Sequence, residues 1–125
     1  NKRELLHAAV WPSVSELHLM ASRTYAFEGR CFVIAAGSVL SRKDLPTDLE
    51  LLNAMPGDGP YQTGGSVIIG PNADILAGPV ENEETLVIAD IDPSLAVKES
   101  MTLDVSGHYS RPDVFTFEVD EDPRE

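Results

Sequence analysis

The chain has little cysteine and no long apolar run: its 125 residues include a single cysteine, Cys31. One cysteine cannot form an internal disulfide bond, which favours a reducing compartment. No apolar stretch approaches the roughly 20 residues that a membrane-spanning helix needs. We therefore expect a soluble, cytoplasmic protein without a membrane partner.

Basic residues and histidines are also scarce, which argues against a nucleic-acid partner and against a metal site. The chain has 9 lysines and arginines against 21 aspartates and glutamates, and its net charge of −12 repels nucleic-acid phosphates. Its 3 histidines, His7, His18 and His108, include no pair at helical ligand spacing. We therefore expect neither a nucleic-acid partner nor a metal site.

Residues 5–36 predict a strand, a helix and a second strand. The first strand, residues 5–11, is mostly apolar and ends before Pro12, as in a strand covered on both faces. Ser13 and Glu16 have the spacing of a capping box, which predicts a helix over about 14–28 that Gly29 ends. Residues 31–36 form the second strand. This order predicts a parallel right-handed crossover in an α/β fold.

One stripe of the predicted helix combines apolar residues with a carboxylate: Val14, Leu17, Ala21, Tyr25 and Glu28. Glu28 is thus expected on a buried face, where a carboxylate needs a partner. We favour a structural glutamate over a pocket acid. Other residues lie on a second side, near Arg23: Leu19, Met20 and Phe27. A helix that is apolar on two sides is sandwiched between layers of one chain or between chains.

The remaining residues predict a long loop, a hairpin, a strand and a short helix. Residues 41–64 are rich in proline and glycine and have a possible helical turn at 48–55. Residues 65–80 read as two strands joined by a tight turn at 71–74, and residues 84–92 as another strand. Asp92 and Pro93 begin a helix. We expect one partial domain over 1–125, with a mobile acidic tail at 118–125.

Cys31 could be a nucleophile or core filling. A reactive thiolate needs a nearby base or cation and some exposure. Arg30 is its neighbour in the sequence, but adjacent residues of a strand point to opposite faces. We therefore favour the interpretation that Cys31 is a small apolar residue of a buried strand.

Five segments together resemble the C-terminal half of a nitrilase, in the carbon–nitrogen hydrolase superfamily. They are "HAAVWPS", "ASRTYAFEGRCFVIAAG", "GGSVIIGPNADILAGP", "ETLVIADID" and "SGHYSRPDVF", and they cover nearly the whole chain from His7 to Phe115. The resemblance implies half of an αββα sandwich and hydrolysis of a nitrile to a carboxylic acid and ammonia. Half of such a sandwich would expose a large apolar sheet face and would associate through it.

The catalytic residues that the resemblance implies have no place in this chain. In the family a cysteine thiolate attacks the nitrile carbon to give a thioimidate, a glutamate is the general base, and a lysine stabilises developing charge. These three residues lie upstream of the strand at residues 5–11, and Cys31 does not match the nucleophile. No cofactor is implied. The chain also lacks an initiator methionine, and we expect a piece of a longer protein.

The residues that do carry over are supporting ones. Trp11, Pro12 and Ser13 follow the carboxyl end of a sheet strand, where open α/β sheets bind ligands, so we expect them to line the substrate pocket. The resemblance implies structural or subunit-organising roles for six further residues: Arg23, Glu28, His108, Tyr109, Arg111 and Pro112.

Three functions remain open. The first is part of a nitrilase that takes a small-molecule nitrile, forms a homo-oligomer and acts only with the missing N-terminal half. The second is a non-catalytic module that folds or oligomerises alone through its exposed former interface. The third, which we rank last, is an independent hydrolase that uses Cys31 with His108.

Overall fold

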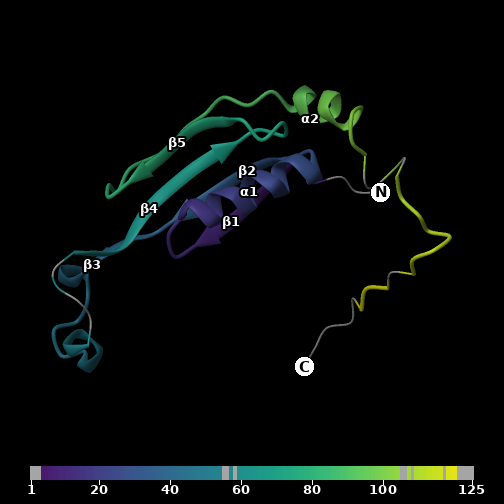
Figure 1. Ribbon diagram of the computed structural model, residues 1–125. Coiled ribbons are helices and arrows are strands. Elements are labelled where there is room, and N and C mark those ends of the chain that lie inside the picture. The colour runs from purple at the N-terminus through teal and green to yellow at the C-terminus, as the bar shows by residue number, and fades with distance from the viewer. Residues whose placement is uncertain are drawn as a thin grey trace.

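The computed structural model describes residues 4–54, 57, 59–104, 107, 109–116 and 118–120. Within these residues, five strands, two α-helices and two 3₁₀ helices follow one another (Figure 1). Their bounds are β1 Leu6–Trp11, α1 Glu16–Gly29, β2 Phe32–Gly37, β3 Val39–Ser41, η1 Arg42–Asp44, η2 Glu50–Asn53, β4 Pro60–Ile69, β5 Ile75–Glu81 and α2 Pro93–Ser100.

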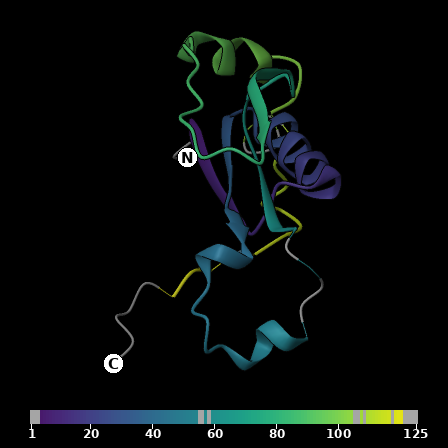
Figure 2. The ribbon, with the colours of Figure 1, turned by 90° about the vertical axis from the view of Figure 1, so that its left-hand side faces the viewer.

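The five strands form one sheet in the order β1-β2-β4-β3, with β5 also paired to β4. β1 and β2 are parallel, with Leu6 opposite Phe32, and α1 makes the crossover between them. The other pairs are antiparallel. The α/β class and the parallel crossover are therefore confirmed. Figure 2 shows α1 on one side of the sheet and the segment that leads from β5 to α2 on the other.

The hydrophobic core lies between α1 and the sheet. It comprises Val14, Ala26, Cys31, Val33, Ala35, Val67 and Ile69, with Ala9, Trp11 and Leu19 packed against it. Cys31 has no exposed surface, which confirms that it fills the core. α1 thus buries one face of β1, β2 and β4.

The ends of α1 differ from the prediction by one or two residues. The helix begins at Glu16 with Ser15 as its N-cap, and the backbone amide of Ser15 donates to Nδ1 of His18. Histidine therefore makes the return contact that glutamate makes in a common capping box. Ser13 does not cap the helix, because its Oγ accepts from the amide of Thr63 at 2.9 Å. At the other end Gly29 is still helical, and Arg30 takes the left-handed conformation (φ 51°).

The predicted buried stripe of α1, and with it the buried position of Glu28, is wrong. The residues of the helix that the structure buries are Ser22 and Ala26, whereas Glu28 is exposed and Leu17 is 71% exposed. The small side chains of Ser22 and Ala26 let α1 lie close to the sheet. The side of α1 that faces the sheet is therefore the side with small residues, not the side with the largest apolar area. Leu17, Met20 and Phe27 stay exposed within the described chain.

The predicted hairpin is confirmed, and the predicted loop is partly ordered. In the turn between β4 and β5, the Asn72 amide donates to Oδ2 of Asp74 at 2.6 Å, and the amide of Gly70 donates to the carbonyl of Asp74. Residues 41–64 hold η1, η2 and the start of β4, with η2 at the predicted helical turn. β4 begins at Pro60, because its first residues pair with β3.

Residues 84–92 were predicted as a strand, and this is wrong. They form no ladder with the described strands, although α2 follows as expected, with Asp92 accepting from the amide of Ser94 at 2.9 Å. Leu86 is 86% exposed and Ile88 is 77% exposed. Residues 84–92 have the alternation of apolar residues that is typical of a strand, but no described strand lies beside them to form backbone hydrogen bonds.

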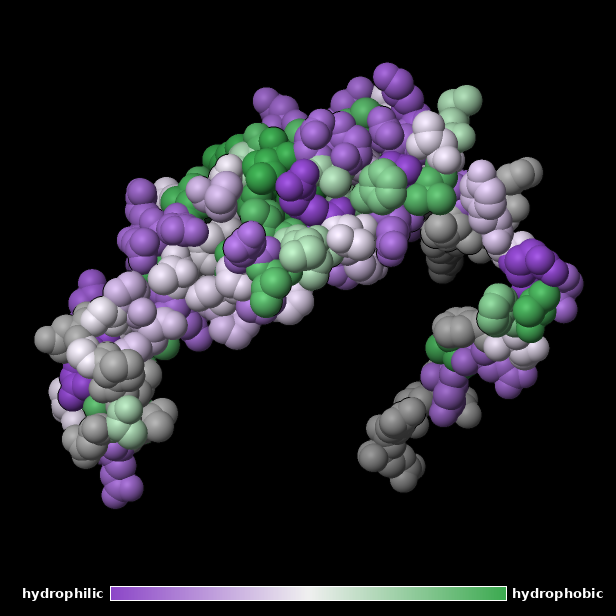
Figure 3. Space-filling model, in the orientation of Figure 1, coloured by the Kyte–Doolittle hydropathy of each residue, from purple (hydrophilic) through white to green (hydrophobic). Residues whose placement is uncertain are grey.

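The sheet face opposite α1 is apolar and bare over most of β1 and the later part of β2, whereas Phe32 at the start of β2 and Ile68 of β4 are buried on it. It carries Leu6, Ala8, Val10, Ile34 and Ala36, all exposed, with Val10 at 82%. β1 is therefore covered on one face only within the described chain, not on both as predicted. Figure 3, which views the molecule from the α1 side, shows further hydrophobic residues gathered over β5. No helix in the described part of the chain has the length and hydropathy needed to cross a bilayer.

Candidate functional site at the carboxyl edge of the sheet

The parallel strands β1 and β2 end side by side, at Trp11 and Gly37. The turn that follows β1 is fastened to its neighbours by the main chain. The amide of Ser38 donates to the carbonyl of Pro12 at 3.1 Å, and the amide of Val14 donates to the carbonyl of Gly64 at 2.7 Å. This carboxyl edge is where open α/β sheets bind ligands.

Glycines permit the close crossing of chains at this edge. A Cβ on Gly37 would overlap the carbonyl oxygen of Gly64, so no larger residue fits there without movement. Gly65 has φ +80° and lies under the carbonyl of Val14, where a side chain would be strained as well as crowded. The Ser66 hydroxyl adds a bond from the Gly37 amide at 3.1 Å. The turn after β1 is thereby held against β2 and β4.

The structure places the three predicted pocket residues, Trp11, Pro12 and Ser13, at this edge, and two of them have partners inside the chain. The indole of Trp11 points to α1, where its N–H donates to Oγ of Ser22 at 3.3 Å. Ser13 bonds the Thr63 amide, and Pro12 is exposed. Their contact with a substrate stays a prediction.

A groove of about 1180 Å³ lies beside the same edge, between the segment after β3 and the end of β5. The amide of Asn82 donates to the carbonyl of Thr63 at 2.8 Å, which links the groove to the turn after β1. Arg42 and Lys43 line it together with Glu83 and Glu84. The groove is thus polar and carries both signs of charge.

Cys31 lies at the other end of β2, roughly 20 Å from the carboxyl edge at about 3.3 Å per residue. Burial raises the pKa of its thiol to about 11, so the thiol stays protonated near neutral pH. A protonated thiol is a poor nucleophile. His108, its proposed partner in an independent hydrolase, lies outside the described residues. Cys31 therefore offers no support for that hydrolase.

A second polar cluster lies near the amino end of β1. The Glu4 carboxylate accepts from the Tyr25 hydroxyl at 2.8 Å and contacts Nδ1 of His7 at 2.9 Å. These hydrogen bonds, from His7 and then Tyr25, lower the pKa of Glu4. Among the described residues, no group of three histidine, cysteine or carboxylate side chains could hold a metal ion.

The residues expected to have structural roles lie away from the carboxyl edge. Arg23 Nε donates to the carbonyl of Ala73 at 2.9 Å and so ties α1 to the turn between β4 and β5. Arg111 pairs with Asp113 at 2.7 Å on the surface, in a segment that leads away from the sheet in Figure 1. Tyr109 and Pro112 lie in the same segment and are exposed.

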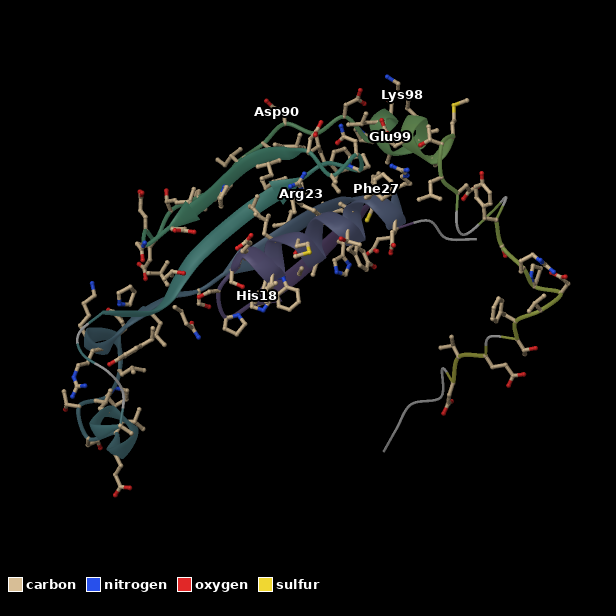
Figure 4. All side chains as sticks on the ribbon, in the orientation of Figure 1. His18, Arg23, Phe27, Asp90, Lys98 and Glu99 are labelled. Atoms are coloured by element: carbon tan, nitrogen blue, oxygen red, sulfur yellow. The ribbon has the colours of Figure 1, made fainter. Side chains whose placement is uncertain are left out.

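Sequence reasoning missed Arg30, the buried charge of this region. Arg30 is 5% exposed, and its guanidinium lies 4.1 Å from the centre of the Phe27 ring and 3.6 Å from the Glu99 carboxylate. It also donates to the carbonyl of Pro71 at 3.4 Å. Figure 4 shows Phe27 near the end of α1 and Glu99 on α2, close to it. The sequence offers no signal for this burial, because Arg30 is joined to Phe27, Pro71 and Glu99 only by the tertiary structure.

The carbon–nitrogen hydrolase family model matches residues 7–98, which is most of the chain. The chain belongs to the carbon–nitrogen hydrolase family. It is 39% identical over 120 residues to "Nitrilase 2" from an unknown prokaryotic organism, a match that covers 94% of this chain and 37% of that protein. It is 40% identical over 102 residues to an aliphatic nitrilase of Sinorhizobium fredii, covering 82% and 33%.

A fungal relative extends the same likeness. The chain is 42% identical over 100 residues to an arylacetonitrilase of Trametes versicolor, a match that covers 78% of this chain and 31% of the relative. The resemblance to nitrilases is therefore confirmed. The chain spans about a third of the length of these curated relatives, with 31% to 37% of each covered.

Proposed function

We propose that this chain is part of a nitrilase, which hydrolyses a small-molecule nitrile to a carboxylic acid and ammonia. The nucleophilic cysteine, the glutamate base and the lysine come from a part of the protein outside this chain. The observation that carries the proposal is the 39–42% identity to proteins named as nitrilases. This chain contributes the carboxyl edge with Trp11, Pro12 and Ser13.

The proposed reaction needs only water besides the nitrile. The cysteine thiolate adds to the nitrile carbon, and the nitrogen takes up a proton to give a thioimidate. A first water adds to the thioimidate carbon, ammonia leaves, and a thioester remains. A second water, activated by the glutamate, cleaves the thioester to the carboxylic acid and restores the thiol. The lysine stabilises the charge that develops on the way.

The exposed sheet face opposite α1 favours the hypothesis that this chain binds a partner. The exposed apolar surface includes Leu6, Val10 and Ile34. Its hydration is unfavourable, and exposed apolar patches of this kind mark interaction sites. β1 is also an edge strand, whose outer backbone groups have no strand beside them within the described sheet. We propose that the remaining part of the same enzyme covers this face and that the assembled enzyme forms a homo-oligomer.

Activity tests the proposal most directly. The protein that carries this chain together with the catalytic part should release ammonia and a carboxylic acid from an aliphatic nitrile or an arylacetonitrile, whereas the chain alone should be inactive. Cys31→Ser should keep full turnover, because the buried thiol takes no part. Release of an amide without ammonia, or no turnover at all, would contradict the nitrilase assignment.

A second function is favoured by the same bare face. A module without catalysis could use Leu6, Val10 and Ile34 to associate with itself. Light scattering of the purified chain separates the two functions. A single oligomer of the chain that neither binds the catalytic part nor gains activity with it would support the module, and recovery of activity on mixing would support the nitrilase.

A further inference from the structure

The indole of Trp11 is held at its edge and on its face by α1. Its N–H donates to Oγ of Ser22 at 3.3 Å, and Ser22 is 3% exposed, so this acceptor is fixed in the core. The His18 ring stacks on the indole with centroids 4.5 Å apart and an angle of 24° between the planes. One contact at the edge of the indole and one on its face restrict its rotation.

His18 is itself fixed by the N-cap of α1. The Ser15 amide donates to Nδ1 of His18 at 3.3 Å, and the Ser15 hydroxyl lies 3.0 Å from the same nitrogen. Since Nδ1 is an acceptor here, the neutral ring carries its proton on Nε2. The start of the helix therefore sets the ring plane of His18. Figure 4 shows His18 in the first turns of α1, close to the end of β1.

The orientation of Trp11 matters for the carboxyl edge because Trp11 is the last residue of β1. The carbonyl of the next residue, Pro12, accepts from the amide of Ser38 just after β2, so the backbone that carries the indole leads directly into the turn that we expect to line the pocket. A rotation of the indole would change the space beside this turn without moving the main chain. A residue that fixes the indole can therefore select among substrates by shape.

We propose that His18 is a positioning residue that fixes the indole of Trp11 and thereby sets which nitriles the carboxyl edge accepts. The proposal rests on the proposed function. His18 does not touch the reacting atoms; it acts through Trp11. The sequence assigned no role to His18, because the histidine spacing indicates no metal site, and its contact with Trp11 is visible in the tertiary structure alone.

The test compares three variants of the full enzyme that carries this chain. His18→Gln keeps an acceptor for the Ser15 amide but removes the stacked ring, and His18→Phe keeps a ring without the acceptor. Leu17→Gln, at the exposed neighbouring residue of the same helical turn, is the matched control. Each variant is assayed with a small aliphatic nitrile and a bulky arylacetonitrile. Fluorine NMR of 5-fluorotryptophan-labelled protein follows Trp11, whose signal Trp11→Phe identifies.

We expect His18→Gln to change the ratio of the two KM values by about threefold to tenfold while kcat stays within about twofold, because the indole adds binding rather than chemistry. The Trp11 fluorine signal should shift. His18→Phe should restore the ratio in large part, and Leu17→Gln should match the parent enzyme. An unchanged KM ratio, or equal changes in both kcat values with a lower melting temperature, would overturn the proposal.

The fluorine signal separates this proposal from the proposed function. If the enzyme turns over no nitrile, the nitrilase assignment fails, and with it the substrate selection proposed for His18. If it turns over nitriles but the Trp11 signal is the same in His18→Gln and the parent enzyme, the nitrilase assignment stands and His18 does not position the indole.

Discussion

The two faces of β1 and β2 are both apolar, yet only one of them is covered along both strands. On the other face Phe32 is buried, whereas most of the remaining residues are exposed. Ala9, Val33 and Ala35 face α1 and belong to the core or pack against it, whereas Val10 and Ile34 face away and are exposed. Burial of the first face stabilises the chain by itself. The exposed part of the second face can lower its free energy only against another surface, so it is the side through which we propose that the chain associates.

The sharpest way to break this comparison is to place a charge on each face in turn. Val33→Asp buries an unpaired carboxylate under α1 and should cost at least about 4 kcal/mol of unfolding free energy, close to complete loss of the fold. Ile34→Asp, one residue along the same strand, should cost clearly less unfolding free energy, because Ile34 is 39% exposed and a carboxylate there keeps contact with water. Equal destabilisation by both substitutions would mean that the second face is also covered.

The same pair tests association with the catalytic part. Ile34→Asp should weaken binding of the chain to that part, because a desolvated carboxylate would face an apolar surface. Size-exclusion chromatography of the mixed components measures this. Retained binding and full nitrile turnover in Ile34→Asp would contradict the proposed use of the bare face.

Gly37→Ala tests the crowded crossing at the end of β2. The new Cβ would overlap the carbonyl of Gly64, and we expect a loss of about 2 to 3 kcal/mol. Gly59→Ala is the matched control, because a Cβ there meets nothing within 4 Å. Urea unfolding of both variants measures the difference. Equal stability would show that the crossing has room to relax.

The pH dependence of stability tests the burial of Cys31 on the covered face. Its thiol has a pKa of about 11 in the folded chain against about 9 ordinarily, so the folded state holds the proton more tightly. The contribution of the protonated thiol to the free energy of unfolding is fully present below pH 9. It should fall by about 2 kcal/mol as the pH rises to 11. In Cys31→Ala the free energy of unfolding should not show this decrease between pH 9 and pH 11. Rapid labelling of the native thiol by iodoacetamide at pH 8 would contradict the burial.

The smallest effect is expected at the rim of the covered face. The pKa of Glu4 is lowered by hydrogen bonds with His7 and Tyr25, so its contribution is present above pH 4.5 and is lost as the pH falls below that value. Because Glu4 is largely exposed, Glu4→Gln should cost about 0.5 kcal/mol or less at pH 7. Thermal unfolding at pH 7 and pH 3 measures this, and a difference that grows toward low pH would contradict it.

Local chemistry made much of the chain predictable. The parallel crossover, the hairpin around Asn72 and Asp74 and the start of α2 at Asp92 follow from apolar periods, turn residues and caps, which act over a few neighbours. The prediction for residues 84–92 was wrong for the opposite reason. Their alternation is typical of a strand, but a strand exists only when another backbone lies beside it.

The sequence likewise predicted one part of the candidate site and not the other. Its place at the carboxyl edge and the residues Trp11, Pro12 and Ser13 could be predicted, because the order of elements fixes where parallel strands end. The partners of those residues could not. His18 and Ser22 lie on α1 and Thr63 lies on β4, so their contacts depend on how these elements pack beside the turn after β1.

The sequence by itself determined the family, the crossover from β1 through α1 to β2 and the burial of Cys31. These follow from residue types and their spacing. Only the tertiary structure decided that Glu28 is exposed, that Arg30 is the buried charge, and that His18 supports Trp11. The physical reason is that side-chain burial depends on the rotation of α1 against the sheet, which small residues such as Ser22 and Ala26 set through close packing.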